Sequence, residues 1–386
     1  MILHISADYP DPIAPAKTKA VHNLLAATND IPHAVYSINR VNWPGAVNAI
    51  PFSGDGDCTA LSYGAPPYGI GLTHYLKPVI HWIVQDVERR QLKPTLIHAH
   101  KFTVEGLIAA ALAKHFGCRF IASLWGDTDT KIFEAKPGLR WRYRAIAAEA
   151  ALLLPAAPWT ADYFSGALTV PNGHMEVLPV MTAGDIVLPP AMRHAPQLIS
   201  VFSLDAWQRK GLDILAKAMT LVARDIPDVT LDLYGAGSAS SLAAAEQILH
   251  KAHAAHLIRL KGPLPHNNVQ QTMNRYAAFV MAPRRETYGM VHVEALLAGL
   301  PILWSKDRGI DGLLPDPLPG YRADPSSASD VAAGIRHLIA KEAALKQVIR
   351  SLQAHGGLDH LRRTAIADRY RDVLARVTGN SMRPAA

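Results

Sequence analysis

The sequence predicts an α/β protein of two domains, each built on a parallel sheet with helices on both faces. Three observations support this prediction. Strand-like and helix-like segments alternate in both halves of the chain, which is the pattern of parallel strands joined by helical crossovers. An aperiodic stretch at 182–197, containing three prolines, separates the halves. The length of 386 residues also exceeds that of one ordinary hydrophobic core.

In the first half, short apolar runs predict strands, and longer segments with a helical apolar period predict the helices between them. The expected strands are 2–6, 34–38, 59–63, 96–100, 119–124, 151–155 and 176–180, and the expected helices are 18–27, 74–90, 103–116 and 141–150. These elements define an N-terminal domain, 1–185. Ligands of parallel sheets bind beyond the carboxyl ends of the strands, so the loops there are the candidate sites.

The alternation restarts after the linker and defines a C-terminal domain, 196–360. Its expected strands are 198–204, 230–234, 258–261, 278–282 and 301–305, and its expected helices are 212–223, 243–252, 268–275 and 291–297. A last helix near 365–377, within the segment 365–386, is expected to return to the first domain and tie the two together.

Composition indicates a soluble globular protein, with 49% hydrophobic and 18% charged residues. The formal net charge of +7 suits anionic partners: nucleotide phosphates, a lipid pyrophosphate or an acidic membrane face. No nucleic-acid recognition motif is present, so nucleic acid is not an expected partner.

Compartment signals favour the cytoplasm. Cys58 and Cys118 are the only cysteines, and they lack metal-ligand spacing, which suggests a reducing environment. The N-terminus has no basic start and is interpreted as a first strand instead of a signal peptide. No run approaches the roughly 18 apolar residues of a membrane span.

One stretch combines a strand, a loop and a helix in an order that suits an anionic ligand. The apolar run 277–282 is followed by a loop with Glu286, then Gly289, and then a helical segment that ends at Gly299. A helix entered through glycine leaves its first N–H groups free to face a phosphate. Carboxylates at Glu286 and Glu294 would then suit sugar and ribose hydroxyls, as in a nucleotide sugar. The plainer interpretation is that Glu286 caps the helix and Glu294 lies on the surface.

Two further loops leave strands of the same domain. Arg209 and Lys210 follow the first strand, where Lys210 is placed to meet a diphosphate as a point charge. Gly235 and Gly237 follow the second strand, although a G-x-G pair is weak and the full dinucleotide fingerprint is absent.

The Glu286-x7-Glu294 arrangement, with Tyr-Gly-Met-Val at 288–291 and Glu-Ala-Leu-Leu-Ala-Gly-Leu-Pro at 294–301, closely resembles the donor-site motif of glycosyltransferase family four. Members of that family are retaining enzymes that use nucleotide sugars. The resemblance spans both domains and is strongest from 198 to 305. It implies the GT-B fold, in which two Rossmann-like domains face each other across a cleft, the first for the acceptor and the second for the donor.

The resemblance implies that Glu286 and Lys210 are catalytic. The implied donor-binding residues are Arg209, Arg285, Gly289, Met290, Val291, Glu294, Gly235, Pro263 and Leu264. The family has an arginine six residues before the lysine, and here that position is Leu204. Arg209, Arg284 or Arg285 is expected to supply the second positive charge, with Arg285 the first to test.

In the first domain, the family's glycine pair after the first strand is absent, and Lys17 in that loop is expected to act electrostatically. His98 and His100 match a His-x-His run, with His98 expected to pack and His100 to face the cleft. Two histidines at this spacing do not make a metal site without further ligands.

Trp125 stands where many relatives have a histidine that contacts the donor sugar. Trp125 is expected to stack on a sugar ring, and Asp127 to be the polar contact. Asp127 and Asp129 also spell the D-x-D of metal-dependent transferases, but those enzymes have another fold with the motif in the nucleotide domain. No metal is therefore expected.

The implied function is a retaining glycosyltransferase of the hexosyltransferase class that moves a sugar from a UDP- or GDP-sugar, with no further cofactor. The expected acceptor is a glycan or a polyprenyl-pyrophosphate-linked molecule of bacterial cell-surface polysaccharide or lipopolysaccharide synthesis. The run 140–144 interleaves cations with aromatic residues, so it either touches lipid headgroups at the inner membrane face or is a solvated helix face. The alternatives are a GT-B nucleotide-sugar epimerase and a non-catalytic sugar-binding protein.

Overall fold

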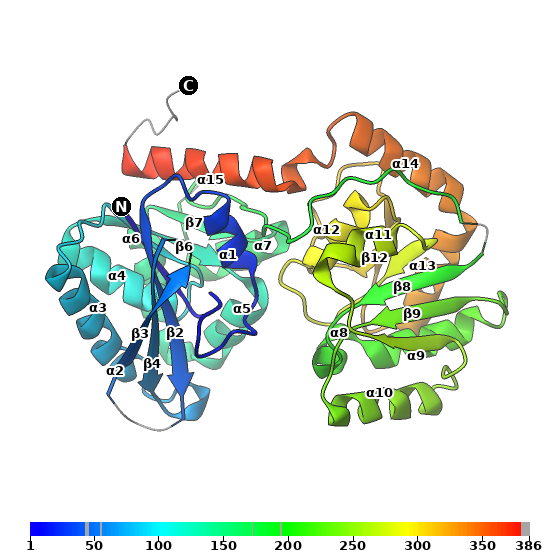
Figure 1. Ribbon diagram of the computed structural model, residues 1–386, viewed down its shortest axis with the longest axis horizontal. Coiled ribbons are helices and arrows are strands. Elements are labelled where there is room, and N and C mark those ends of the chain that lie inside the picture. The colour runs from blue at the N-terminus through cyan, green and yellow to red at the C-terminus, as the bar shows by residue number, and fades with distance from the viewer. Residues whose placement is uncertain (43–45, 55, 172, 194, 380–386) are drawn as a thin grey trace. The chain divides into compact units, whose positions relative to one another are not determined.

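The structure is a computed structural model that describes residues 1–42, 46–54, 56–171, 173–193 and 195–379. Its contacts divide the chain into two compact units. The N-terminal unit comprises Met1–Ala156, Thr160–Met181 and the chain from Arg363, and the C-terminal unit comprises Ala157–Trp159 and Thr182–Arg362. Both are α/β units, which confirms the predicted class (Figure 1).

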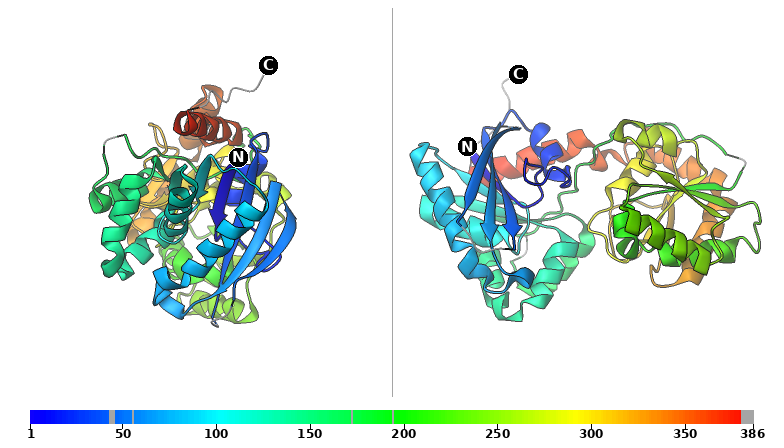
Figure 2. Two further views of the ribbon diagram at one scale, coloured as in Figure 1. Left: turned by 90° about the vertical axis from the view of Figure 1, so that its left-hand side faces the viewer. Right: turned by 60° about the horizontal axis from the view of Figure 1, so that its bottom comes forward.

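The N-terminal unit is built on a seven-stranded sheet in the order β3-β4-β2-β1-β5-β6-β7, parallel except for the antiparallel β3–β4 pair. Its strands are β1 Ile2–Ser6, β2 His33–Val41, β3 Asn48–Gly54, β4 Gly56–Gly64, β5 Leu96–Ala99, β6 Arg119–Leu124 and β7 Leu152–Pro155. Strand β1 is buried along its whole length because helices cover both faces of the sheet (Figure 2).

Each face of this sheet has its own hydrophobic cluster, since side chains alternate along a strand. Leu3 and Ile5 belong to the cluster beneath α3, α4 and α6, whereas Ile2 belongs to the cluster beneath α15. The helices are α1 Ala20–Ala26, α2 Leu72–Tyr75, α3 Lys77–Arg89, α4 Glu105–Phe116, α5 Gly126–Ala135, α6 Arg140–Glu149, α7 Pro158–Leu168 and α15 Arg363–Thr378.

The C-terminal unit is built on a six-stranded parallel sheet in the order β10-β9-β8-β11-β12-β13. Its strands are β8 Gln197–Val201, β9 Thr230–Tyr234, β10 Ile258–Gly262, β11 Ala278–Val280, β12 Ile302–Ser305 and β13 Gly320–Ala323. Its helices are α8 Trp207–Lys210, α9 Leu212–Val222, α10 Ala239–Lys251, α11 Val269–Met273, α12 Met290–Leu297, α13 Ala328–Ala340 and α14 Glu342–Ala354. Because β8 and β11 are neighbours, the loops at their carboxyl ends lie side by side.

One expected strand is wrong, and two strands, β3 and β13, were missed. The segment 176–180 forms no strand; Met175, the residue before it, makes an isolated bridge with Leu153 of β7. The N–H groups of Glu176 and Leu178 still donate to carbonyls of β7, so the apolar residues are buried without a continuous ladder. Strand β3 was not predicted because its residues are largely exposed and its short apolar run contains Pro51.

Helix α15 packs on the N-terminal unit, as its place along that unit in Figure 1 shows. Tyr370 and Leu374 are fully buried in the cluster beneath it. The Tyr370 hydroxyl lies 2.7 Å from Nδ1 of His98 in a hydrogen bond, and Arg371 forms an ion pair with Asp30 at 2.8 Å. Every helix that the structure describes is too short or too polar to cross a bilayer.

Replacing Leu374 with alanine is expected to lower the free energy of unfolding by about 2–5 kcal/mol, because the cavity would open in a fully packed cluster. Urea unfolding followed by circular dichroism measures this change. Asp372→Ala, at an exposed position on the same helix, is the matched control and is expected to stay within about 0.5 kcal/mol of the wild type. Equal effects of the two changes would contradict the packing of α15.

Candidate functional site

The carboxyl ends of β8 and β11 bring Lys210 and Glu286 together. Lys210 is the last residue of α8, the short turn after β8, and Glu286 lies in the loop after β11. The Lys210 ammonium donates to Glu286 Oε2 at 2.5 Å, with the side chains 13% and 10% exposed. The pair is thus shielded from most of the solvent.

Backbone contacts fix these two loops against each other. The Arg209 carbonyl accepts from the N–H groups of Arg284 and Arg285 at 3.0 and 3.4 Å. Gly211 has φ +74°, and a Cβ there would lie 2.9 Å from the Ala282 carbonyl oxygen. A side chain at this position would therefore push apart the loops that carry Lys210 and Glu286.

Glu286 is a buried carboxylate. Burial acts to raise its pKa, but the charge and hydrogen bond of Lys210, with the more distant Arg209, outweigh burial and hold the pKa below its usual value. The group is therefore ionised at neutral pH and accepts hydrogen bonds only. Such a carboxylate can accept from ligand hydroxyls and can stabilise positive charge.

Gly289 begins α12 with φ +82°, as the sequence pattern predicts for a helix entered through glycine. A Cβ at Gly289 would lie 2.7 Å from Nδ1 of His292, so the backbone and this buried ring are in close contact. His292 Nε2 hydrogen-bonds the Met281 carbonyl at 3.0 Å. Met290 and Val291 are half-buried in the first turn.

Glu294 lies further along α12 and is half-buried. Its Oε1 accepts from the Gly184 N–H at 3.3 Å. Burial raises the pKa of Glu294 to about 7, and the Gly184 hydrogen bond opposes the rise only in part. The carboxyl group thus titrates near neutral pH.

The cations around the pair differ in their roles. Arg284 forms a bidentate ion pair with Asp213 at 2.6 and 2.7 Å, so its charge serves the structure of the loop. Leu204, at the position of the family arginine, is 1% exposed and packs against Gly237. Arg285 is exposed and Arg209 is half-buried, and these two remain the predicted sources of the second positive charge.

Position 235 requires glycine because the backbone there is in close contact with the backbone of the loop after β8. A Cβ there would lie 1.8 Å from the Phe202 carbonyl oxygen, which excludes any other residue without rearrangement. The Gly235 N–H donates to the Gly262 carbonyl at 2.8 Å, which holds the next loop beside it. In that loop Pro263 is exposed and Leu264 half-buried.

Sequence reasoning missed the residues that support the Glu286 loop from outside. Trp159 donates from Nε1 to the Thr287 carbonyl at 3.1 Å, and the Arg308 guanidinium lies 4.9 Å from the centroid of the Trp159 ring. Gly309 donates its N–H to the Glu286 carbonyl at 3.3 Å. These contacts join segments distant in sequence, so no local pattern signals them.

In the N-terminal unit, Lys17 is neutralised internally. Its ammonium donates to Asp11 Oδ2 at 2.7 Å and to Ser37 Oγ at 2.9 Å. Burial acts to raise the pKa of Asp11, but hydrogen bonds from Lys17, Ser37 and Asn39 lower it to about 2. Lys17 is thus held in a largely buried ion pair with Asp11.

His100, which the sequence predicts to face the cleft, is a buried residue. Its ring is 2% exposed and shares a hydrogen bond with His4 at 3.0 Å, because the end of β5 lies beside β1. Trp125 is half-buried and packs against a small cluster that includes Tyr9 and Val21. Asp127 is half-buried in the first turn of α5.

The Asp127-x-Asp129 pair has a structural explanation. Asp129 is fully buried and accepts from the Trp125 N–H at 2.8 Å and from the N–H and hydroxyl of Thr103 at 2.9 and 2.7 Å. These bonds hold the start of α5 against the loop after β5.

A polar group at the carboxyl ends of β1 and β5 was not anticipated. Lys101 forms an ion pair with Asp8 at 2.7 Å, and Glu105 Oε1 accepts from the Ala7 N–H at 2.9 Å. Burial raises the pKa of Glu105 to about 8, against the opposing charge of Lys101. Glu105 follows an ordinary helix-start pattern, so its sequence context does not distinguish it from an exposed first-turn acid.

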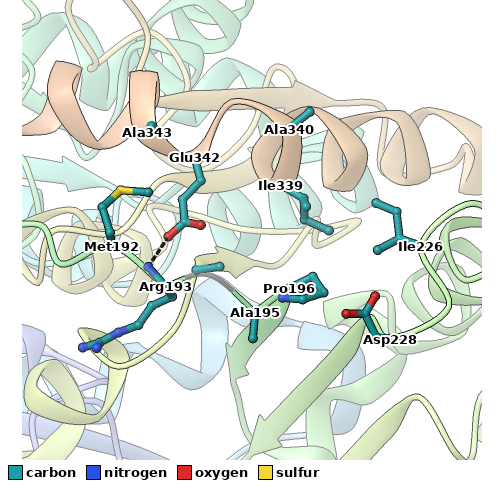
Figure 3. Close-up of a pocket in the computed structure, with 11 residues that line it drawn as sticks. Met192, Arg193, Ala195, Pro196, Ile226, Asp228, Ile339, Ala340, Glu342 and Ala343 are labelled. Atoms are coloured by element: carbon teal, nitrogen blue, oxygen red, sulfur yellow. Dashed lines mark hydrogen bonds between the residues drawn. The ribbon is translucent and has the colours of Figure 1, made fainter.

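A pocket of about 430 Å³ lies at the amino-terminal end of β8, the end opposite to Lys210 (Figure 3). Glu342 on its wall accepts from the Arg193 N–H at 2.9 Å, while Asp228 lies at the other end of the pocket. None of the residues predicted from the sequence as a site residue lines it.

Comparison with known families assigns a domain to each half of the chain. Residues 34–181 match the glycosyl transferase 4-like domain, and residues 194–354 match glycosyl transferases group 1. The GtfA subunit of the UDP-N-acetylglucosamine–peptide N-acetylglucosaminyltransferase of Streptococcus pneumoniae is 30% identical over 134 residues, 34% of this chain and 25% of GtfA. Glycogen synthase of Mycobacterium tuberculosis is 25% identical over 142 residues, 37% of this chain and 34% of that protein. The matches thus cover about a third or less of these relatives' own length.

Solved structures show the fold over nearly the whole chain. Sucrose-phosphate synthase of Thermosynechococcus elongatus has a TM-score of 0.75 at 17% identity, covering 98% of this chain and 99% of that one. Anabaena HepE in complex with UDP has a TM-score of 0.71 at 15% identity, covering 97% and 99%. The chain therefore combines a glycosyl transferase 4-like domain with a glycosyl transferases group 1 domain, and these give it the domain content and the fold of a GT-B glycosyltransferase.

Proposed function

We propose that this chain is a retaining glycosyltransferase of family four that transfers a sugar from a UDP-sugar to a hydroxyl group of a glycan or lipid-linked acceptor. The observation that carries the proposal is the buried Lys210–Glu286 pair beside the glycine-started helix α12. Two domain matches support the reaction class, and UDP in the HepE complex supports the choice of uridine over guanosine.

The C-terminal unit is proposed to bind the donor. The diphosphate would lie at the start of α12, where first-turn N–H groups and the helix dipole favour an anion, with Lys210 as the nearest cation. Arg209 or Arg285 would add the second positive charge that Leu204 does not supply. Glu294 would accept from the ribose hydroxyls, and Gly235, Pro263 and Leu264 would lie toward the nucleoside.

Glu286 has two roles in this arrangement. It would accept hydrogen bonds from hydroxyls of the transferred sugar, and its negative charge would stabilise the positive charge that develops at the anomeric carbon. Lys210 and the helix N–H groups would stabilise the negative charge of the departing diphosphate, which is the dominant electrostatic contribution in such chemistry. The contact with Lys210 keeps Glu286 ionised before the donor arrives.

Retention of configuration follows if the acceptor attacks from the face that the diphosphate leaves. The bond from the anomeric carbon to the phosphate oxygen breaks, and the bond to the acceptor oxygen forms on the same side. The acceptor proton passes to the departing phosphate oxygen, so no separate base is required. Side chains of the N-terminal unit, among them Trp125 and Asp127, are proposed to contact the acceptor or the sugar, and cell-surface polysaccharide or lipopolysaccharide synthesis is the proposed setting.

Lys210→Ala and Glu286→Ala are each expected to lower turnover of the preferred UDP-sugar at least about tenfold, equivalent to about 1.4 kcal/mol of transition-state stabilisation. Release of UDP, with and without acceptor, measures turnover after a panel of nucleotide sugars has been screened by thermal stabilisation. Lys217→Ala, at an exposed position on α9, is the matched control. Unchanged rates in folded variants would refute the assignment, and sugar interconversion without UDP release would indicate an epimerase.

Affinity for the UDP-sugar is expected to rise several-fold between about pH 6 and pH 8, since the Glu294 carboxyl, with its pKa raised to about 7, must lose its proton to accept from both ribose hydroxyls. Titration calorimetry with a UDP-sugar measures this, and the sugar ester removes the terminal phosphate ionisation of free UDP. Glu294→Gln is expected to bind more weakly at pH 8 and to lose the pH dependence. A slope that persists in the variant would exclude Glu294 as its source.

A further inference from the structure

Three buried histidines converge in the N-terminal unit. His4 lies on β1 beside His98 on β5, and His100 follows two residues later. Each ring offers a nitrogen atom, and these atoms lie within 4.8 Å of one another. The three side chains are 1%, 0% and 2% exposed. The sequence shows the His98–His100 pair but not the third residue, which the pairing of β1 with β5 supplies.

The distances suit a small metal ion after a minor adjustment. Zn²⁺ binds imidazole nitrogens at about 2.0–2.1 Å, which places tetrahedral ligands about 3.4 Å apart. Nδ1 of His4 and Nε2 of His100 are 3.0 Å apart. Burial and the neighbouring rings lower the pKa of each histidine, so the imidazoles are neutral and have lone pairs to donate.

His98 has the partners that commonly orient a metal-binding ring. Its Nδ1 hydrogen-bonds the Tyr370 hydroxyl at 2.7 Å, and its Nε2 hydrogen-bonds the Ser123 hydroxyl at 2.9 Å. A ligand histidine normally keeps one such bond while its other nitrogen binds the metal. His100, Ser123 and Trp125 also line a cavity of about 30 Å³, which is enough for a water molecule as the fourth ligand.

We propose that His4, His98 and His100 form a buried site for a divalent transition-metal ion, with Zn²⁺ as the ion that three imidazoles and one water fit best. Binding breaks the His4–His100 hydrogen bond and one of the two hydrogen bonds of His98, and each ring then carries its single proton on the nitrogen that does not face the ion, so three neutral imidazoles bind the metal with no net loss of a proton. The ion would join β1 to β5 and, through Tyr370, to α15. This role is structural.

The test uses the full chain without an affinity tag, freed of metal by a chelator and titrated with Co²⁺ and Zn²⁺. A single equivalent of Co²⁺ is expected to give the strong visible absorption of a tetrahedral site, to be displaced by Zn²⁺, and to raise the melting temperature. Mg²⁺ is expected to do neither, because it prefers oxygen ligands. The absorption is read on the wild type, so the result does not depend on any variant folding.

Variants then locate the site. His98→Gln and His100→Gln are expected to abolish stoichiometric binding, and Tyr370→Phe to weaken it about tenfold by removing the partner of His98. His256→Gln, at an exposed position of the C-terminal unit, is the matched control and is expected to bind as the wild type does. Absence of the Co²⁺ spectrum in the wild type, or full binding in the folded His98 and His100 variants, would overturn the proposal.

Discussion

The candidate site of the C-terminal unit depends on one ion pair, Lys210–Glu286, that is shielded from most of the solvent. A carboxylate as buried as that of Glu286 would take up a proton or leave its pocket if the Lys210 charge were removed. The cost of burying both charges is offset because their loops are already joined through the Arg209 carbonyl. An anionic ligand that draws Lys210 toward itself would therefore act on Glu286 at the same time, so that the proposed donor binding and the proposed sugar contact would be coupled through this pair.

Much of the fold could be predicted from the sequence, because buried parallel strands are continuous apolar runs. The second half shows this for β9 and β12, whose expected and observed positions nearly coincide. The errors lie in segments where burial and strand pairing do not occur together. Residues 176–180 are apolar because they pack beside β7, yet they form no ladder, whereas β3 pairs fully but is exposed.

The candidate site was predictable where one short segment contains several of its parts. The spacing of Glu286, Gly289 and Glu294 is local, and the structure places all three on one loop and helix. Other features depend on the burial or pairing of distant residues. The sequence around Lys17 does not indicate its ion pair with Asp11, and the sequence around His100 does not indicate its hydrogen bond with His4. The support of the Glu286 loop by Trp159 and Arg308 likewise exists only after folding.

Helix α15 has a consequence for how the molecule is made. The first sheet emerges from the ribosome well before the residues that cover one of its faces, since Tyr370, Val373 and Leu374 are synthesised after the whole second unit. Until then Ile2, Leu96 and Ile121 lack their apolar cover. One apolar face of the first unit therefore stays uncovered during synthesis until α15 has been added.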